Sequence, residues 1–206
     1  MVHPTFERLA EEKRQRILKA ARREFIAYAY EKSSINRILE DAQIPKGSFY
    51  QYFDDKADLF GLCIREVYRK LIEARRSNGE KLLESGMLRM KKMGYEKGYE
   101  SFTQDLTRYL EQEDFDLFER MLAAPSHIRN FVQTDAASTL IAPVFLEELK
   151  EDAQVRRDID YGYYAYLLSM TEVIPVDYGT RNGRRMEEIF YLSYLYMRSI
   201  YDSILI

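Results

Sequence analysis

The chain has 206 residues, of which 46% are hydrophobic, and its formal net charge at pH 7 is -3. This composition is typical of a globular chain of one or two domains and excludes a disordered or fibrous one. The slightly acidic balance argues against indiscriminate nucleic-acid binding. A local basic patch is still possible, because salt screens charges that lie far from the contact.

The residue inventory also limits the compartment and the chemistry. The single cysteine, Cys63, excludes an internal disulfide and fits a reducing cytoplasm. No apolar run is long enough to span a bilayer, and the stretch MVHPTFERLAEEKRQR lacks the apolar core of a signal peptide. The two histidines, His3 and His127, are far apart, and neither belongs to a metal or triad pattern. We therefore expect a cytoplasmic protein without membrane association, metal, cofactor or enzymatic activity.

Helical periodicity dominates the N-terminal third of the chain. We predict a first helix over residues 11–30, whose apolar stripe consists of Ile17, Ala21, Phe25 and Tyr28. A second helix is predicted to start at the Ser33-Ser34 cap. Its apolar residues follow the i, i+3, i+4, i+7 rule and are Ile35, Ile38, Leu39 and Ala42.

A very short turn at Gln43-Ile44 separates the second helix from a third, which we expect to begin near Pro45. A fourth helix, capped by Asp54 or Asp55, should end before Gly79. Beyond this point the prediction is still helical but coarser. Breaks are expected near residues 94–98, 124–126, 152–160 and 175–183, and Pro143 should kink a helix over residues 130–150.

Residues 44–56 read IPKGSFYQYFDDK, which is richer in aromatic and polar side chains than a core alone requires. Phe49 and Phe53 are four residues apart, so they should share the inward face of the third helix. The remaining side chains are left for the outer faces or the rim. Two short helices joined by a tight turn form a helix-turn-helix, whose second helix enters the DNA major groove.

Two further features are consistent with a DNA-binding surface. Lys56 lies in the first turn of the fourth helix, where a cation is unfavourable unless the lysine and the helix N-terminus serve one phosphate. Residues 13–23, KRQRILKAARR, hold six basic side chains and no acidic one. Each feature alone is more often a solvated surface, and the aromatic cluster alone is more often core. Their coincidence with the helix-turn-helix favours the functional interpretation.

At these positions the chain resembles the TetR/AcrR family of bacterial transcriptional regulators. The family signature, a Thr/Ser-Ile/Val pair followed by Ala-Gly-Val-Ser-Lys-Gly-Thr-Leu-Tyr-x-Tyr-Phe and a Lys, is similar to Ser34-Ile35, to the run 42–53 (AQIPKGSFYQYF) and to Lys56. The resemblance covers about residues 10–71. It implies a helix-turn-helix domain, a helical ligand-binding and dimerisation domain, and repression relieved by a small molecule.

The resemblance also assigns DNA contacts by position. It implies phosphate contacts for Ser34, Tyr50, Tyr52 and Lys56. It places Asn36, Lys46, Gly47, Ser48 and Gln51 near the bases. Two positions depart from the family, because Gln43 and Ala29 stand where glycine is usual. A non-glycine residue in a left-handed conformation costs roughly 1–2 kcal/mol, so either these turns differ or the strain is tolerated.

The C-terminal helices suggest a subunit interface. Apolar and aromatic residues surround nearly the whole circumference of a predicted helix over residues 186–204. With the preceding aromatic helix, over residues 161–174, it should form a four-helix interface with a second copy of the chain. The alternative is complete burial inside one subunit. The expected interface residues are Tyr194, Leu195, Met197, Ile200 and Tyr201.

Methionine and aromatic residues of the second domain could line a cavity for an apolar or aromatic effector. The candidates are Phe102, Tyr109, Met121, Phe131, Tyr166 and Met170. Each of them is, taken singly, more often ordinary core. Glu172 could provide a counter-charge for a cationic ligand, or it could be a surface carboxylate or the acceptor of a tyrosine hydroxyl.

The sequence therefore predicts an all-α protein with a DNA-binding domain over residues 10–71 and a ligand-binding and dimerisation domain over residues 72–206. Its expected partners are palindromic operator DNA, a small effector and a second copy of the chain. The alternatives are a helical small-molecule binding protein and a protein-protein adaptor, neither with a DNA function. Salt-sensitive binding to a palindrome would distinguish the repressor from both.

Overall fold

The computed structural model describes residues 2–82, 93–171 and 173–206. Within these ranges the regular structure is helical, and extended pairing is limited to isolated bridges between Val2 and Phe53 and between Val155 and Leu205. The predicted all-α fold is confirmed. Every described helix is too short or too polar to cross a lipid bilayer.

The chain divides into two compact units, each assembled from two segments. The first contains Met1–Val67 and Glu111–Val132, and the second contains Tyr68–Leu110 and Gln133–Ile206. The sequence predicted a single boundary after residue 71. It did not predict that the chain returns to the first unit over Glu111–Val132. That return has a polar cause, because the Arg22 guanidinium donates to the buried Asp114 carboxylate at 2.6 Å.

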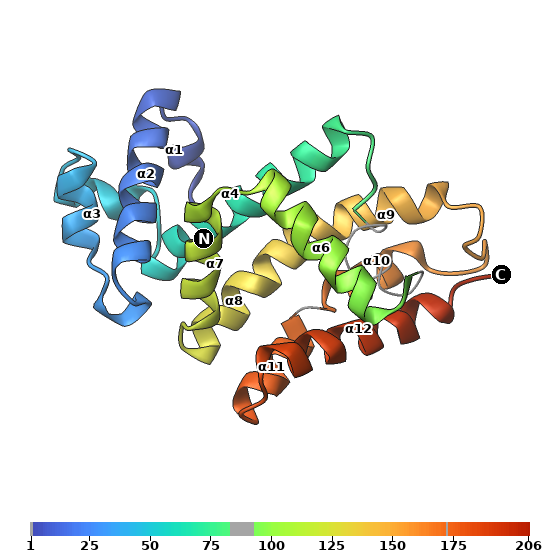
Figure 1. Cartoon of the computed structure of the whole chain (residues 1–206). Helices are drawn as coiled ribbons and strands as arrows, with labels where there is room; N and C mark the ends of the chain where they lie inside the picture. Colours follow the sequence, from blue (N-terminus) through green and yellow to red (C-terminus); the bar gives the residue numbers. More distant parts are fainter. Residues whose placement is uncertain (1, 83–92, 172) are drawn as a thin grey trace. The chain divides into compact units, whose positions relative to one another are not determined.

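The first unit holds the N-terminal helices, coloured blue to cyan in Figure 1. Its elements in chain order are α1 (Pro4–Glu7), α2 (Glu11–Ala27), η1 (Tyr30–Lys32), α3 (Ile35–Asp41), η2 (Lys46–Gln51), the first half of α4 (Lys56–Ser77), α7 (Gln112–Leu122) and the start of α8 (Ser126–Ala136). Helix α2 packs against both α3 and α7. The core is aromatic, and its fully buried rings are Phe6, Phe25, Phe49, Phe53 and Phe60.

Two N-terminal elements differ from the prediction. Helix α2 ends at Ala27, because the backbone of Tyr28 is extended, and the Tyr28 ring is 44% exposed beneath the Arg37 guanidinium instead of completing the apolar stripe. The third helical element is a short 3₁₀-helix that starts at Lys46. Pro45 precedes it with an extended backbone and serves as its N-cap. Helix α1 was not predicted.

The two positions where glycine is usual in the family behave differently. Gln43 has a φ of 54°, the left-handed conformation that favours glycine, and it is the one non-glycine residue with positive φ among the described residues. The Ile44 N–H donates to the Leu39 carbonyl across this turn at 3.0 Å. Ala29 has a φ of -55° and requires no glycine. The strain is therefore tolerated at Gln43 and absent at Ala29.

The second unit contains the second half of α4 and the remaining helices (Figure 1). These are α6 (Tyr95–Tyr109), the end of α8, the π-helix η3 (Ala137–Ile141), α9 (Ala142–Glu151), α10 (Tyr161–Ser169), α11 (Val173–Arg181) and α12 (Met186–Asp202). Helix α10 packs on α9 and α12, and α11 packs on α12. Their core includes Leu149, Val155, Leu168, Met197 and Ile204.

Two prolines in the second unit have different effects. Pro143 occupies the first turn of α9, and the π-helix η3 stands directly before it. A proline lacks the N–H that would continue the α-helical ladder, so the predicted irregularity occurs there. Pro175 lies in the first turn of α11, where an N–H is not needed, so the break expected over residues 175–183 does not begin at the proline. It occurs after Arg181, where Gly183 has a φ of 63°, and another break follows α10 after Ser169.

Candidate nucleic-acid interface

Helix α3 and the 3₁₀-helix η2 form the predicted helix-turn-helix. They are separated by residues 42–45, and the strained Gln43 makes the sharp change of direction. Ile38 and Phe49 are each 1% exposed, so they hold the inner faces of the two elements in the core. The same inward anchoring of Phe49 and Phe53 was predicted from their spacing.

The outer face of this motif carries most of the predicted contact residues. Asn36, Lys46, Gly47 and Gln51 are exposed, and Tyr50 is 67% exposed despite its aromatic ring. Ser34 and Ser48 are half-buried. Lysine and glutamine can bond base edges, whereas tyrosine and serine hydroxyls can bond phosphate oxygens. The motif thus presents hydrogen-bonding groups around one exposed element.

Gly47 has no internal reason to be glycine in the described structure. Its φ is not positive, and a Cβ built on it would meet nothing within 4 Å. A side chain would therefore fit the free protein, although it would occupy the space in front of η2. Close approach of another molecule to the backbone is a use for glycine that fits this position.

Tyr52 differs from the outward orientation expected for it. It is only 4% exposed, and its ring lies 6.0 Å from the ring of Phe6 in an edge arrangement. Its hydroxyl accepts a hydrogen bond from Lys13 Nζ at 3.2 Å. The ring is therefore part of the core, and Lys13, which the motif did not indicate, lies at the polar tip of this residue.

Lys56 also has partners inside the chain. Its ammonium group donates to the Tyr30 carbonyl at 2.5 Å and to the Ser33 carbonyl at 3.0 Å, and it lies 4.5 Å from the centre of the Tyr30 ring. Burial lowers the pKa of Lys56, against the opposing effect of Glu31 and Glu24. In the sequence, a phosphate was the only evident partner for this lysine. The structure supplies two carbonyl acceptors, which fasten the turn before α3 to the start of α4.

A buried carboxylate organises the start of α3 and was missed in the sequence. Glu24 is 7% exposed and accepts from the Ser34 N–H at 2.7 Å and from the Arg37 guanidinium at 2.5 Å. Arg37 Nη2 also donates to the Lys32 carbonyl at 2.9 Å. A glutamate among the polar residues of an amphipathic helix gives no signal of burial, so periodicity alone could not identify it.

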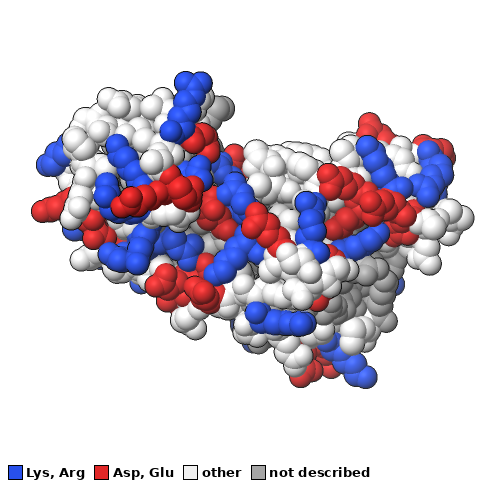
Figure 2. All heavy atoms as spheres, turned by 90° about the horizontal axis from the view of Figure 1, so that it is seen from above, with Lys and Arg blue, Asp and Glu red and all other residues white. Residues whose placement is uncertain are grey.

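The cationic face expected from residues 13–23 is partly neutralised. Arg22 pairs with Asp114, Arg23 with Asp41 at 3.2 Å, and Arg14 with Glu11. Figure 2 accordingly shows basic and acidic side chains interspersed over the face seen from above. Any attraction to DNA should therefore depend on a few well-placed cations and not on a broad basic surface.

The described ligand candidates are divided between the two units. Met121, which is buried, and Phe131, which is exposed, belong to the first unit. Tyr109, Tyr166 and Met170 belong to the second, where Tyr166 is exposed and Met170 lies in a small core with Ala137 and Val173. The side chain of Phe102 and all of Glu172 lie outside the described residues.

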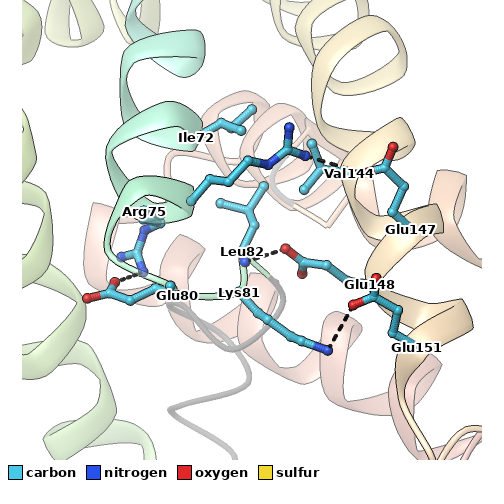
Figure 3. Close-up of a pocket in the computed structure, with 11 residues that line it drawn as sticks. Ile72, Arg75, Glu80, Lys81, Leu82, Val144, Glu147, Glu148 and Glu151 are labelled. Atoms are coloured by element: carbon cyan, nitrogen blue, oxygen red, sulfur yellow. Dashed lines mark hydrogen bonds and ion pairs between the residues drawn. The ribbon is translucent and has the colours of Figure 1, made fainter.

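A cavity of about 260 Å³ is present elsewhere in the second unit, between the end of α4, residues 79–82 and α9 (Figure 3). Most of the residues that line it are charged, and several of them pair with one another. Arg75 pairs with Glu80 at 3.1 Å, and Glu148 accepts from the Leu82 N–H at 2.7 Å. The predicted ligand residues are absent from this lining, although the Tyr109 hydroxyl donates to Glu80 at 2.7 Å.

The expected interface residues of α12 mostly face the core of their own unit. Tyr194, Met197, Ile200 and Tyr201 are all buried in the second unit. Leu195 is 39% exposed, so it alone of the five lies on the outer face. Helical periodicity could not separate the two faces, because both are apolar. Together with Leu195, the exposed large side chains described on the C-terminal helices are Tyr163, Tyr166, Ile174, Tyr178 and Tyr191.

Within the described residues, no group of His, Cys, Asp and Glu side chains is arranged to hold a metal ion. Cys63 is fully buried in α4, and burial raises the pKa of its thiol to about 12. A thiol of this kind is a poor nucleophile at neutral pH, because the thiolate is the reactive form.

Known proteins match the same segment that carries the helix-turn-helix. The sequence model described as "Bacterial regulatory proteins, tetR family" matches residues 17–63. Transcriptional regulator AcuR of Cereibacter sphaeroides is 41% identical over 54 residues, which make up 26% of this chain and 24% of AcuR. HTH-type transcriptional repressor AcnR of Corynebacterium glutamicum is 35% identical over 75 residues, which make up 36% of this chain and 40% of AcnR.

A solved TetR family transcriptional regulator from Chloroflexus aurantiacus is similar over 98% of this chain and 94% of its own, with 22% identity and a TM-score of 0.44. The N-terminal segment is therefore similar to the TetR family of bacterial regulatory proteins, which confirms the resemblance seen in its motif. The chain covers well under two thirds of the length of AcuR and AcnR.

Proposed function

We propose that this protein is a sequence-specific DNA-binding transcriptional regulator that reads the major groove with η2. The observation that carries the proposal is the helix-turn-helix itself. Its inner face is anchored by buried rings, while Lys46, Tyr50 and Gln51 stand exposed on its outer face. Buried anchors fix the register of the element, and exposed polar side chains can then discriminate between base edges.

The half-buried Ser34 and the exposed Asn36 at the start of α3 would flank this reading element. Glu24 and Lys56 both bond the backbone that leads into α3, so they hold this segment in place. Phosphate contacts position a protein on the duplex without reading its sequence. In this proposal Lys56 supports the phosphate-contacting turn, whereas its own ammonium is already engaged by two carbonyls.

The functional form would be a homodimer on a palindromic operator, because two-fold protein symmetry matches two-fold symmetry in the DNA. The surface that supports dimerisation is the outer face of α12. Tyr191 and Leu195 are four residues apart on this helix and are both exposed. Exposed apolar side chains arranged in this way are typical of protein interfaces.

The proposed regulation is repression that a small effector relieves. The cavity beside the end of α4 is the candidate site, and its charged lining favours a small polar or ionic effector over the apolar one expected from the sequence. Helix α4 runs from Lys56 in the first unit to this cavity in the second. An effector that prefers one position of α4 would shift the operator-binding equilibrium, whereas one that binds both states equally would not.

The experiment that tests the proposal is selection of bound sequences from a pool of random duplex DNA. The expected result is enrichment of one palindromic site whose half-sites lie about 34–36 Å apart, equal to one helical turn. Binding to that site should weaken steeply with salt. A small-molecule binding protein or an adaptor would enrich no sequence, and that result would reject the proposal.

A further inference from the structure

The C-terminal end of η2 leaves backbone carbonyls that need donors, as every helix end does. The first residues of the chain provide two of them. The His3 N–H donates to the Tyr52 carbonyl at 2.8 Å, and the His3 ring atom Nδ1 lies 3.2 Å from the Gln51 carbonyl. The N-terminal segment therefore caps the end of the element that carries Gln51.

Apolar packing holds the same segment in place. Phe6 is 1% exposed, and its ring centre lies 4.9 Å from that of Phe53 and 6.0 Å from that of Tyr52. Val2 forms an antiparallel bridge with Phe53. A ring buried to this degree stabilises docking of the segment. The cap is thus a packed part of the first unit.

The His3 ring has a second hydrogen-bond partner. Its Nε2 atom lies 2.7 Å from Asp54 Oδ1, while Nδ1 faces the Gln51 carbonyl. Both partners are acceptors, and neutral imidazole can donate from only one of its nitrogens. The imidazolium alone can make both hydrogen bonds. A cation at a helix C-terminus is also favoured by the helix dipole.

We propose that residues 2–6 are a positioning cap for η2, and that the charged form of His3 fixes the end of η2 from which Gln51 reaches DNA. The inference rests on the proposed function. A 3₁₀-helix of six residues has poor internal hydrogen-bond geometry, so its orientation depends on what fastens its ends. When His3 loses its proton, one of the two bonds is lost and operator affinity falls.

Other charged groups surround this contact. The N-terminal amino group also interacts with Asp54 and, together with His3, lowers the pKa of its carboxyl. An α-amino group titrates at about pH 7.7–8.0, above the interval of histidine. In the first turn of α4, Asp58 accepts from the Asp54 N–H at 3.0 Å. On the side of α2, Arg14 pairs with Glu7 at 3.8 Å, and Lys13 donates to Tyr52. Carboxylates, lysine and arginine keep their charge between about pH 5.5 and 7.5, the interval in which histidine side chains change theirs.

The experiment measures operator affinity of the full chain by fluorescence anisotropy across that interval, with the affinity tag at the C-terminus. The DNA is the palindrome selected from the random pool. We expect wild-type affinity to fall roughly three- to tenfold as pH rises, as loss of one charge-assisted hydrogen bond implies. His3→Gln and Asp54→Asn should each give a flat profile. His127→Gln is the matched control, because the chain has only two histidines, and it should keep the wild-type profile.

Thermal melting at each pH establishes that each variant is folded, so a flat profile in a folded variant reports positioning. A wild-type profile in folded His3→Gln would overturn the inference and leave the proposed function intact. A wild-type protein that selects no sequence at any pH would reject the proposed function and the inference together. These two failures are distinguished by the selection experiment alone.

Discussion

The two compact units differ in where they place large aromatic side chains. In the first unit the rings of Phe6, Phe49, Phe53 and Phe60 are at most 1% exposed, and several contact one another. In the second unit, large side chains on α10, α11 and α12 are exposed, among them Tyr166, Tyr178 and Tyr191. The first unit concentrates its phenylalanine rings in its core, whereas the second exposes large side chains along three helices, which form a surface suited to a partner.

The difference follows from what each unit has to do. A short reading element needs a rigid base, and interlocked rings provide it with little conformational freedom. A dimer face needs apolar area that is left outside its own core. Substitutions in each unit test this difference.

The largest effect should come from truncating a ring of the first unit. Phe53 contacts Phe6, Phe49 and Tyr52, and Phe53→Ala would leave a cavity among these rings. We expect the free energy of unfolding to fall by about 3–5 kcal/mol. Denaturant titration measures it. Tyr178→Ala, on the exposed face of the second unit, should change it by no more than about 0.5 kcal/mol. Equal losses in both variants would contradict the comparison.

The next effect concerns association. Leu195→Glu combined with Tyr191→Glu places two charges on the exposed face of α12. We expect the dimer dissociation constant to rise by about a hundredfold or more, since charges in the centre of an interface cost about 2–4 kcal/mol. Analytical ultracentrifugation measures it.

The matched control for association is Ile206→Glu, which introduces the same charge at an exposed apolar residue near the C-terminus. Its dissociation constant should equal that of the wild type. A wild-type chain that sediments as a monomer at micromolar concentration would show that the exposed face of α12 serves another partner.

A smaller effect separates the two turns around α3. Gln43→Gly should raise the free energy of unfolding by roughly 0.5–1 kcal/mol, because glycine relieves the left-handed strain while its unfolded chain is more flexible. Ala29→Gly should lower the free energy of unfolding by about 0.4–1 kcal/mol, because no strain is relieved there and glycine only makes the unfolded chain more flexible. Thermal and denaturant unfolding measure both variants. If the two substitutions change the free energy of unfolding in the same direction, this account of the turns is refuted.

The smallest effect at neutral pH concerns the closed core around Cys63. Its thiol pKa is raised by burial to about 12 from 9.0, so a thiol reagent at pH 8 should label the protein only after unfolding. Between pH 9.0 and about 12, the thiol of the folded protein keeps a proton that the thiol of the unfolded chain has lost. This contribution to stability is complete below pH 9.0 and is lost as pH rises toward 12. Rapid labelling of the native protein would contradict the burial.

The sequence predicted the first unit well where local signals agree. The spacing of Phe49 and Phe53 identified the inner face of η2, and the family signature located the turn at Gln43. The pattern could not show that Lys56 and Tyr52 are engaged inside the chain. Their partners, the carbonyls of Tyr30 and Ser33 and the ammonium of Lys13, are distant in sequence, and hydrogen bonds of this kind leave no periodic trace.

The second unit was predicted less well, because its helices are apolar on more than one face. Periodicity then cannot distinguish Leu195, which is exposed, from Tyr194 and Met197, which are buried. Pro175 was read as a break, although a proline in a first turn is equally compatible with a helix start. The cavity beside α9 is lined by charged residues, so a search for apolar residues could not have found it.

The most direct test of the central claim, that η2 reads DNA, compares affinity for the selected palindrome with affinity for a scrambled duplex. Lys46→Ala and Gln51→Ala should each lower the free energy of specific binding by about 1–3 kcal/mol and alter the preferred base. Tyr50→Phe should weaken binding to both duplexes alike. Unchanged affinity and base preference in all three variants would contradict the account.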